Sequence, residues 1–252
     1  TLTGAFSLLL VFTAGLLTII TTHSQTYFSR SLAGSGLLIG VAVIFLVVPG
    51  RTGYLAFFVM SGFMLYNLYK LNRFSTVIMV FIVMVFVLNS SVFKQRIVAG
   101  KSDLQLYSGG VVTTSMGARF EMWKVSWHNF TENPLIGAGT NGFGPRWMKE
   151  GYSKNTYAFN NPHSTYFHIL GNYGLVGFSV LLFFLWRLTV AAWLFRGTLV
   201  GSATGAFLIV FAVGGLTNTM LTGDFYLAWL ALIAGMVSGL KSKEIHVVAS
   251  KD

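Results

Sequence analysis

The sequence has no cysteine and few charged residues, and each of these features excludes certain kinds of site or classes of protein. Without thiols, disulfides, thiolate catalysis and cysteine-bound metals are excluded. Charged residues make up 10% of the 252 residues and hydrophobic residues 54%, whereas soluble domains are about a quarter charged. So little polar surface cannot cover a water-facing globule. A soluble enzyme, a nucleic-acid-binding module and a disordered chain are therefore disfavoured.

What the sequence has instead is a series of apolar runs of about 20 residues, the length that crosses a bilayer as a helix. The runs are continuously apolar rather than alternating, which disfavours a transmembrane β-barrel. We predict an all-α, multi-span helical membrane protein with about seven transmembrane helices. The chain opens at Thr1 without Met or a signal pattern, so we expect the C-terminal part of a longer protein. The expected spans are Thr3–Thr22, Leu32–Val48, Thr52–Tyr69, Phe74–Val92, Leu175–Trp193, Leu199–Thr217 and Phe225–Leu240.

Basic residues in the short connections set the expected orientation. They fall on one side of the predicted spans, which the positive-inside rule makes cytoplasmic. The long polar segment from Phe93 to Pro162 then lies outside, with eight Lys and Arg against four Asp and Glu, an excess of four positive charges. Such a surface attracts anions. We expect transmembrane helices in 1–92, a periplasmic loop with short helices in 93–174, transmembrane helices in 175–240 and a cytoplasmic tail in 241–252.

Aromatic residues recur at steps of three and four within the outer segment, as on one face of a helix. They are Phe120, Trp123, Trp127 and Phe130. The helix should end near Asn133-Pro134. Arg119 then lies at its beginning, close to the membrane surface.

A second helix is predicted from Pro162 towards Gly174. Asn161 is a good N-cap and Pro162 a good first helical residue, which puts His163 in the first turn. The positive helix end disfavours a protonated imidazole there, and a neutral histidine can accept a proton. A lone histidine is more often structural than catalytic, so the residues alone leave both roles open.

Arg51 interrupts apolar sequence at the expected outer face of the membrane. It is either a loop arginine that snorkels to water or a ligand for an anionic head group. The run from Gly137 to Gly142 matches a dinucleotide fingerprint, but without a preceding strand a glycine-rich turn is favoured. The few acids form no cluster with the spacing of a metal site, so no metal is expected.

Together these features resemble the bacterial O-antigen ligase and polymerase superfamily, over essentially the whole chain, as its C-terminal portion. Three elements in the family's order carry the resemblance: Gly50-Arg51-Thr52-Gly53; Ser115-Met116-Gly117-Ala118-Arg119-Phe120-Glu121-Met122-Trp123 with Asn133-Pro134-Leu135-Ile136-Gly137-Ala138-Gly139 and Gly142-Phe143; and His163-Ser164-Thr165-Tyr166-Phe167 with Leu170 and Gly174-Leu175-Val176-Gly177. Gly50 and Ser164 depart from the serine and asparagine that family members often have, and the family's N-terminal spans are missing.

The resemblance implies a metal-independent, multi-span glycosyltransferase without a cofactor, in the bacterial inner membrane. Its donor would be a glycan on undecaprenyl diphosphate, and its acceptor a sugar hydroxyl of lipid A–core on the periplasmic face. The implied catalytic residues are Arg51 and Arg119, which would stabilise the leaving diphosphate, and His163, the general base. The expected substrate-binding residues are Arg96, Trp123, Arg146 and Asn161. An O-antigen polymerase, a protein O-oligosaccharyltransferase and, from another class, a transporter of lipid-linked glycans remain as alternatives.

Overall fold

The protein is described by a computed structural model. It describes residues 2–23, 51–69, 89–150, 159–196 and 198–222, with isolated residues at 81 and 85 and between 227 and 239. This part of the chain is helical and holds no strand. Its elements are α1 (Leu2–His23), α3 (Arg51–Tyr69), α5 (Ser91–Ser108), α6 (Ser115–Glu132), α7 (Phe143–Lys149), α8 (Thr165–Leu194), α9 (Leu199–Thr217) and the 3-10 turn η2 (Met220–Thr222).

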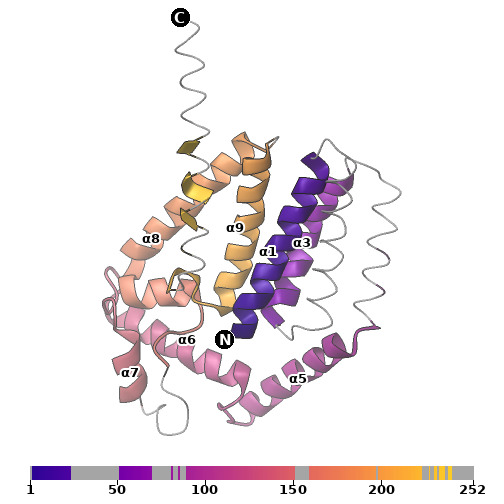
Figure 1. The fold of residues 1–252 in the computed structure, drawn as a ribbon. Coiled ribbons are helices and arrows are strands. Elements are labelled where there is room, and N and C mark those ends of the chain that lie inside the picture. Colours follow the sequence, from indigo (N-terminus) through magenta and orange to yellow (C-terminus); the bar gives the residue numbers. More distant parts are fainter. Residues whose placement is uncertain are drawn as a thin grey trace, which may run out of the picture.

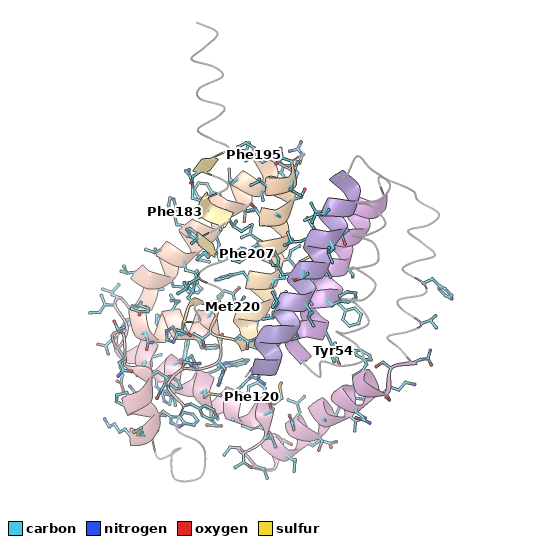
Figure 2. The ribbon with its side chains drawn as sticks, viewed as in Figure 1. Tyr54, Phe120, Phe183, Phe195, Phe207 and Met220 are labelled. Carbon is cyan, nitrogen blue, oxygen red and sulfur yellow. The ribbon has the colours of Figure 1, made fainter. Side chains whose placement is uncertain are left out.

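Helices α1, α3 and α9 contact one another pairwise and form the apolar bundle (Figure 1). Small residues allow the helices to approach closely, the usual way in which helices pack in lipid. Gly53 is one example, because an added Cβ would lie 2.4 Å from Cβ of Ser7 on α1. Phe207 of α9 (labelled in Figure 2) meets Phe12 of α1 edge to face, with ring centroids 6.1 Å apart. The all-α prediction therefore holds for the described residues.

Two described helices, α8 and α9, are long and apolar enough to cross a membrane, and shorter apolar stretches lie at Ser7–Ile20 in α1 and Thr52–Phe63 in α3. Helix α8 leaves much of its apolar surface uncovered, including Trp186 and Phe183, the latter labelled in Figure 2. Such a surface suits contact with lipid. The spans predicted at 32–48 and over most of 74–92 and 225–240 lie outside the described residues, so the number seven stays a prediction.

Helices α5, α6 and α7 lie across one end of the bundle (Figure 1). Helix α6 begins where the Thr114 side chain accepts a hydrogen bond from the Gly117 amide (3.1 Å), an N-cap. It ends at Glu132, as the Asn133-Pro134 pair predicted. Met122 and Val125 of α6 pack on Phe143 and Trp147 of α7 in a separate small core.

Helix α8 is broken at Gly174, whose φ of 60° and ψ of −156° are not helical. The break leaves two amides and two carbonyls without helical partners, and the loop after α6 supplies them. Leu175 and Val176 donate to the carbonyls of Pro134 (2.8 Å) and Leu135 (3.1 Å). In return, the carbonyls of Gly171 and Asn172 accept hydrogen bonds, each 2.9 Å long, from the amides of Ala138 and Gly139.

Two glycines make this insertion possible. A Cβ on Gly137 would lie 2.4 Å from the Asn172 carbonyl carbon, and one on Gly174 would lie 2.5 Å from the Leu135 carbonyl. Both residues have positive φ, which glycine adopts at low cost. The glycine-rich turn predicted for 137–142 is therefore confirmed. Its hydrogen bonds also attach the segment between α6 and α7 to the break in α8.

Candidate active site at the end of helix α9

The loop that precedes α8 carries His163 in an unusual backbone conformation. Its φ is 48°, a left-handed value uncommon for residues other than glycine. For this reason the predicted helix start at Pro162 is wrong, and α8 begins at Thr165 after Ser164. The Asn161 side chain still acts locally, because its Oδ1 accepts a hydrogen bond from the His163 amide (3.1 Å). Strain of this kind is often kept at functional sites.

The end of α9 holds this loop in place. Ser164 donates from Oγ to the Gly215 carbonyl (3.1 Å). The Thr165 hydroxyl donates to the Asn218 carbonyl (2.9 Å) and accepts from the Met220 amide (2.8 Å). All three bonds are buried or nearly so, which makes them costly to break.

Thr219 completes the anchor and was not predicted from the sequence. Its Oγ1 donates to Asn161 Oδ1 (2.9 Å), the same oxygen that accepts the His163 amide. One carboxamide oxygen thus joins the histidine backbone to the turn after α9. The available signal was the polar run Thr217-Asn218-Thr219, which ends an otherwise apolar helix.

The His163 ring is partly buried against Phe159, whose ring centroid lies 5.6 Å away at a near-perpendicular angle. Burial lowers the pKa of His163 to about 4, and the positive charge of Arg119 acts in the same direction. The imidazole is therefore neutral near pH 7, as expected. The main cause is burial rather than the helix end from which we predicted it.

Arg119 lies in the first turns of α6, as predicted, and its charge acts on His163. Its Nη1 donates to the Ser115 hydroxyl (3.1 Å), which fixes the guanidinium over the helix start. Trp123 of the second motif stacks on Phe167 of the third, so these two motifs lie side by side.

Arg51 is the first residue of α3, and its side chain lies outside the described atoms. The next residue, Thr52, shares a hydrogen bond with Thr217 at the end of α9. The start of α3 therefore reaches the same end of α9 that holds the His163 loop. Arg96 lies on α5, and its side chain is likewise outside the described atoms.

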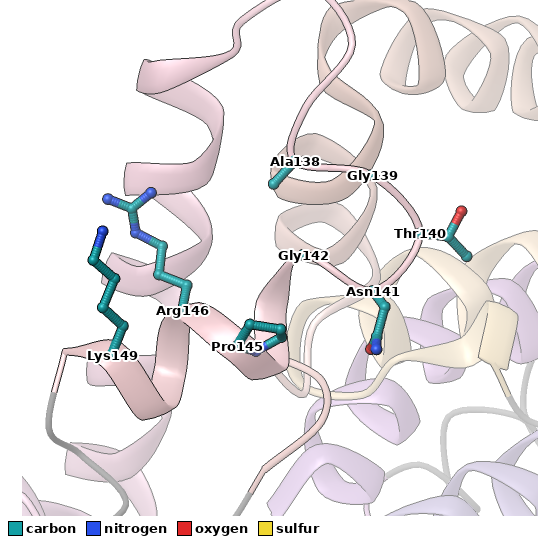
Figure 3. Close-up of a pocket in the computed structure, with 8 residues that line it drawn as sticks. All are labelled: Ala138, Gly139, Thr140, Asn141, Gly142, Pro145, Arg146 and Lys149. Carbon is teal, nitrogen blue, oxygen red and sulfur yellow. The ribbon is translucent and has the colours of Figure 1, made fainter.

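Arg146 on α7 has several partners within the protein. Its guanidinium pairs with both oxygens of Glu132, and its Nε donates to Glu150 (2.7 Å). A third contact runs from Nη1 to Asn129 Oδ1 (3.3 Å). With its charge compensated, Arg146 links α6 to α7, and this arrangement favours a structural role over binding of an anion. It lines an open hollow of about 470 Å³ with Lys149 and the turn from Ala138 to Gly142 (Figure 3).

Trp123 faces the beginning of α8, where its ring stacks on Phe167 with centroids 5.3 Å apart and planes inclined by 12°. The aromatic face predicted on α6 therefore contacts protein at this point. Among the described residues, no three His, Asp or Glu side chains gather as a metal-binding group.

The family model described as "O-Antigen ligase" matches residues 42–182, more than half of the chain. The chain belongs to this family. The matched range runs from before α3 into α8 and contains Arg51, Arg119 and His163. Proteins of this family are membrane proteins, and two of the described helices are long and apolar enough to cross a bilayer.

An uncharacterized protein of Haemophilus influenzae is also similar, with 34% identity over 94 residues. The match covers 35% of this chain and 24% of that protein. The chain thus aligns with about a quarter of the length of this relative.

Proposed function

We propose that this O-antigen ligase family member transfers a glycan from undecaprenyl diphosphate to a sugar hydroxyl of lipid A–core. The reaction takes place on the periplasmic face of the bacterial inner membrane, where we assign residues 93–174. The observation that carries the proposal is His163, a neutral histidine held in a strained loop within the field of Arg119. A neutral base next to a fixed cation suits an alcohol acceptor and an anionic leaving group.

In the proposed step, His163 takes the proton of the acceptor hydroxyl. The oxygen forms a bond to the anomeric carbon, and the bond from that carbon to the diphosphate breaks. The electron pair leaves with the diphosphate. General-base catalysis of this kind contributes about 10²–10⁴-fold. The lowered pKa of His163 keeps the acceptor form populated at neutral pH, although it also makes the ring a weak base.

We assign Arg119 and Arg51 to the diphosphate, because guanidinium groups bind phosphate oxygens in a bidentate way without a metal. The assignment is supported by the hydrogen bond between Thr52, beside Arg51, and Thr217 at the end of α9, and by the charge of Arg119 acting on His163. Asn161 shapes the loop that carries the base. Arg96 stays a proposed helper. Arg146 is less suited to this role, because Glu132 and Glu150 already engage its guanidinium.

The experiment is a transfer assay with the full-length protein in nanodiscs, carrier-linked glycan from the host strain and rough lipopolysaccharide, with excess chelator. His163→Asn is the test variant, because asparagine tolerates the left-handed backbone at this position and leaves the loop intact. Asn160→Ala, an exposed change in the same loop, is the control. We expect about a 10²-fold or greater loss in the test variant only.

The products separate the alternatives. Longer carrier-linked chains without transfer to lipopolysaccharide would indicate a polymerase, and a glycosylated protein would indicate an O-oligosaccharyltransferase. Absence of any covalent product would favour transport. Full activity of His163→Asn would remove the general-base assignment, and loss of activity in chelator would refute metal independence.

A further inference from the structure

An open hollow of about 490 Å³ lies where α5, α6 and the beginning of α8 meet, next to the candidate active site. We call it the aromatic hollow. Its lining contains aromatic rings, one lysine and one histidine, but no aliphatic side chain. The lining residues are Tyr107, Phe120, Trp123, Lys124, Trp127, His128 and Phe167.

The rings of the aromatic hollow support one another. Trp123 stacks on Phe167, and Phe120 meets Trp123 edge to face at 5.6 Å and Tyr107 at 5.0 Å. These contacts fix a wall of ring surface that spans three helices. Trp127 is different, because 48% of its surface is exposed. An exposed indole beside fixed rings offers a flat apolar surface to a ligand.

Charged groups lie among these rings. Lys124 donates to Glu121 Oε1 (2.8 Å), lies 5.4 Å from the centre of the Tyr107 ring and is 55% exposed at its side chain. His128 Nδ1 lies 3.1 Å from Glu150 Oε1. Both side chains keep nitrogen atoms available at the rim. A purely hydrocarbon ligand would desolvate these groups without replacing their hydrogen bonds, which is costly.

The aromatic hollow continues from the reacting groups along both helices. Trp123 follows Arg119 by four residues on α6, so the two side chains occupy the same helix face. Phe167 lies in the first turn of α8, just after the His163 loop. Two of the residues that line the aromatic hollow thus lie four positions after Arg119 and His163 in the sequence, and their rings stack on each other across α6 and α8.

We propose that the aromatic hollow binds a pyranose ring of the donor glycan. The C–H face of the ring stacks on Trp127, and its hydroxyls accept a hydrogen bond from Lys124 and donate one to Nε2 of His128, whose Nδ1 faces Glu150. This assignment rests on the proposed function for the identity of the glycan as donor. The observations favour a sugar because its two kinds of surface, apolar C–H faces and polar hydroxyls, match the two kinds of lining.

The test measures binding and transfer separately, with full-length protein in nanodiscs. The binding probe is the lipid-free oligosaccharide released by mild acid from the host strain's carrier-linked glycan, detected by saturation-transfer NMR. Trp127→Ala is compared with Trp127→Phe, which keeps an aromatic plane. Trp186→Ala is the control, because this tryptophan is also exposed (57%) and lies farther along α8, outside the aromatic hollow. Thermal unfolding verifies that each variant is folded.

We expect Trp127→Ala to weaken oligosaccharide binding and raise KM for the donor by about 3- to 10-fold, with kcat near wild type. Trp127→Phe should lie close to wild type, and Trp186→Ala should match it. Unchanged oligosaccharide binding in Trp127→Ala would overturn the proposal.

The transfer and binding assays together distinguish a failure of the proposed function from a failure of the sugar site. His163→Asn should abolish transfer but still bind the free oligosaccharide, because the binding assay needs no chemistry. If His163→Asn transferred the glycan normally while Trp127→Ala lost oligosaccharide binding, His163 would not be the general base, but the sugar site would be supported. Normal binding by both variants would overturn the sugar site whatever the transfer assay gave.

Discussion

Replacing Gly174 with alanine should break the junction between α8 and the loop after α6. The backbone at this position, with φ of 60° and ψ of −156°, lies in a region that is essentially confined to glycine. Forcing another residue into such a region costs about 1–3 kcal/mol. In addition, the new Cβ would lie 2.5 Å from the Leu135 carbonyl and 2.7 Å from the Gly137 amide nitrogen, closer than atoms can approach.

The loop therefore has to leave, and four backbone hydrogen bonds go with it. At a net value of about 0.5–1.5 kcal/mol each, they contribute about 2–6 kcal/mol. With the conformational cost, the loss of unfolding free energy is about 3–9 kcal/mol, against a usual total of about 5–15 kcal/mol. An effect this large should be visible in detergent, in the thermal unfolding of the full-length protein and in its expression level.

Gly100→Ala is the matched control, because this glycine lies within α5 and an added Cβ meets nothing within 4 Å. It should be neutral or stabilise by up to about 1 kcal/mol. Gly137→Ala disrupts the same junction from the loop side. The loss of unfolding free energy in the double variant with Gly174→Ala should therefore be clearly smaller than the sum of the two single losses. A Gly174→Ala protein with wild-type unfolding and transfer would refute the inserted loop.

Two further predictions concern the base and its anchor. The pKa of His163 lies well below 6.5, so its neutral form is lost only as the pH falls towards about 4. We therefore expect kcat/KM to stay level from pH 8 to 6 and to fall as the pH approaches 4. An acid limb near pH 6.5 in a pH–rate profile would contradict this. Thr219→Val removes the hydroxyl that holds Asn161, so kcat should fall by about 2- to 12-fold with KM unchanged, and Thr219→Ser should recover it. Thr189→Val, on the exposed part of α8, is the control, and equal losses in Val and Ser variants would argue against positioning.

Helices that are continuous apolar runs were predictable almost to the residue. Leu199–Thr217 coincides with α9, and Thr52–Tyr69 differs from α3 by one residue at its start. Each run is bounded by polar sequence and needs no distant partner to be recognised. The start of α8 was missed because the capping pattern at Asn161 is local, whereas its side chain is engaged by Thr219 from a distant turn.

The candidate site was predictable in its chemistry but not in its contacts. Arginine and histidine could be chosen from the sequence, since few side chains serve a diphosphate and a hydroxyl. One of the two acidic partners of Arg146 was recognisable from the sequence, because Glu150, the C-cap of α7, lies four residues after it. Its second partner, Glu132, comes from another helix and depends on how α7 packs on α6. Long-range pairing of this kind leaves no local pattern.

The end of α9 explains how the first and third motifs reach one place. Thr217 bonds Thr52 beside Arg51, Gly215 accepts from Ser164 beside His163, and Thr219 bonds Asn161. None of these α9 residues is a candidate for the chemistry, and α9 lies beyond the range of the family match. Apolar helices slide against one another at little cost in lipid, because no hydrophobic force fixes their register. The hydrogen bonds at this helix end supply that register, and substitutions there should disturb the base and the first arginine together.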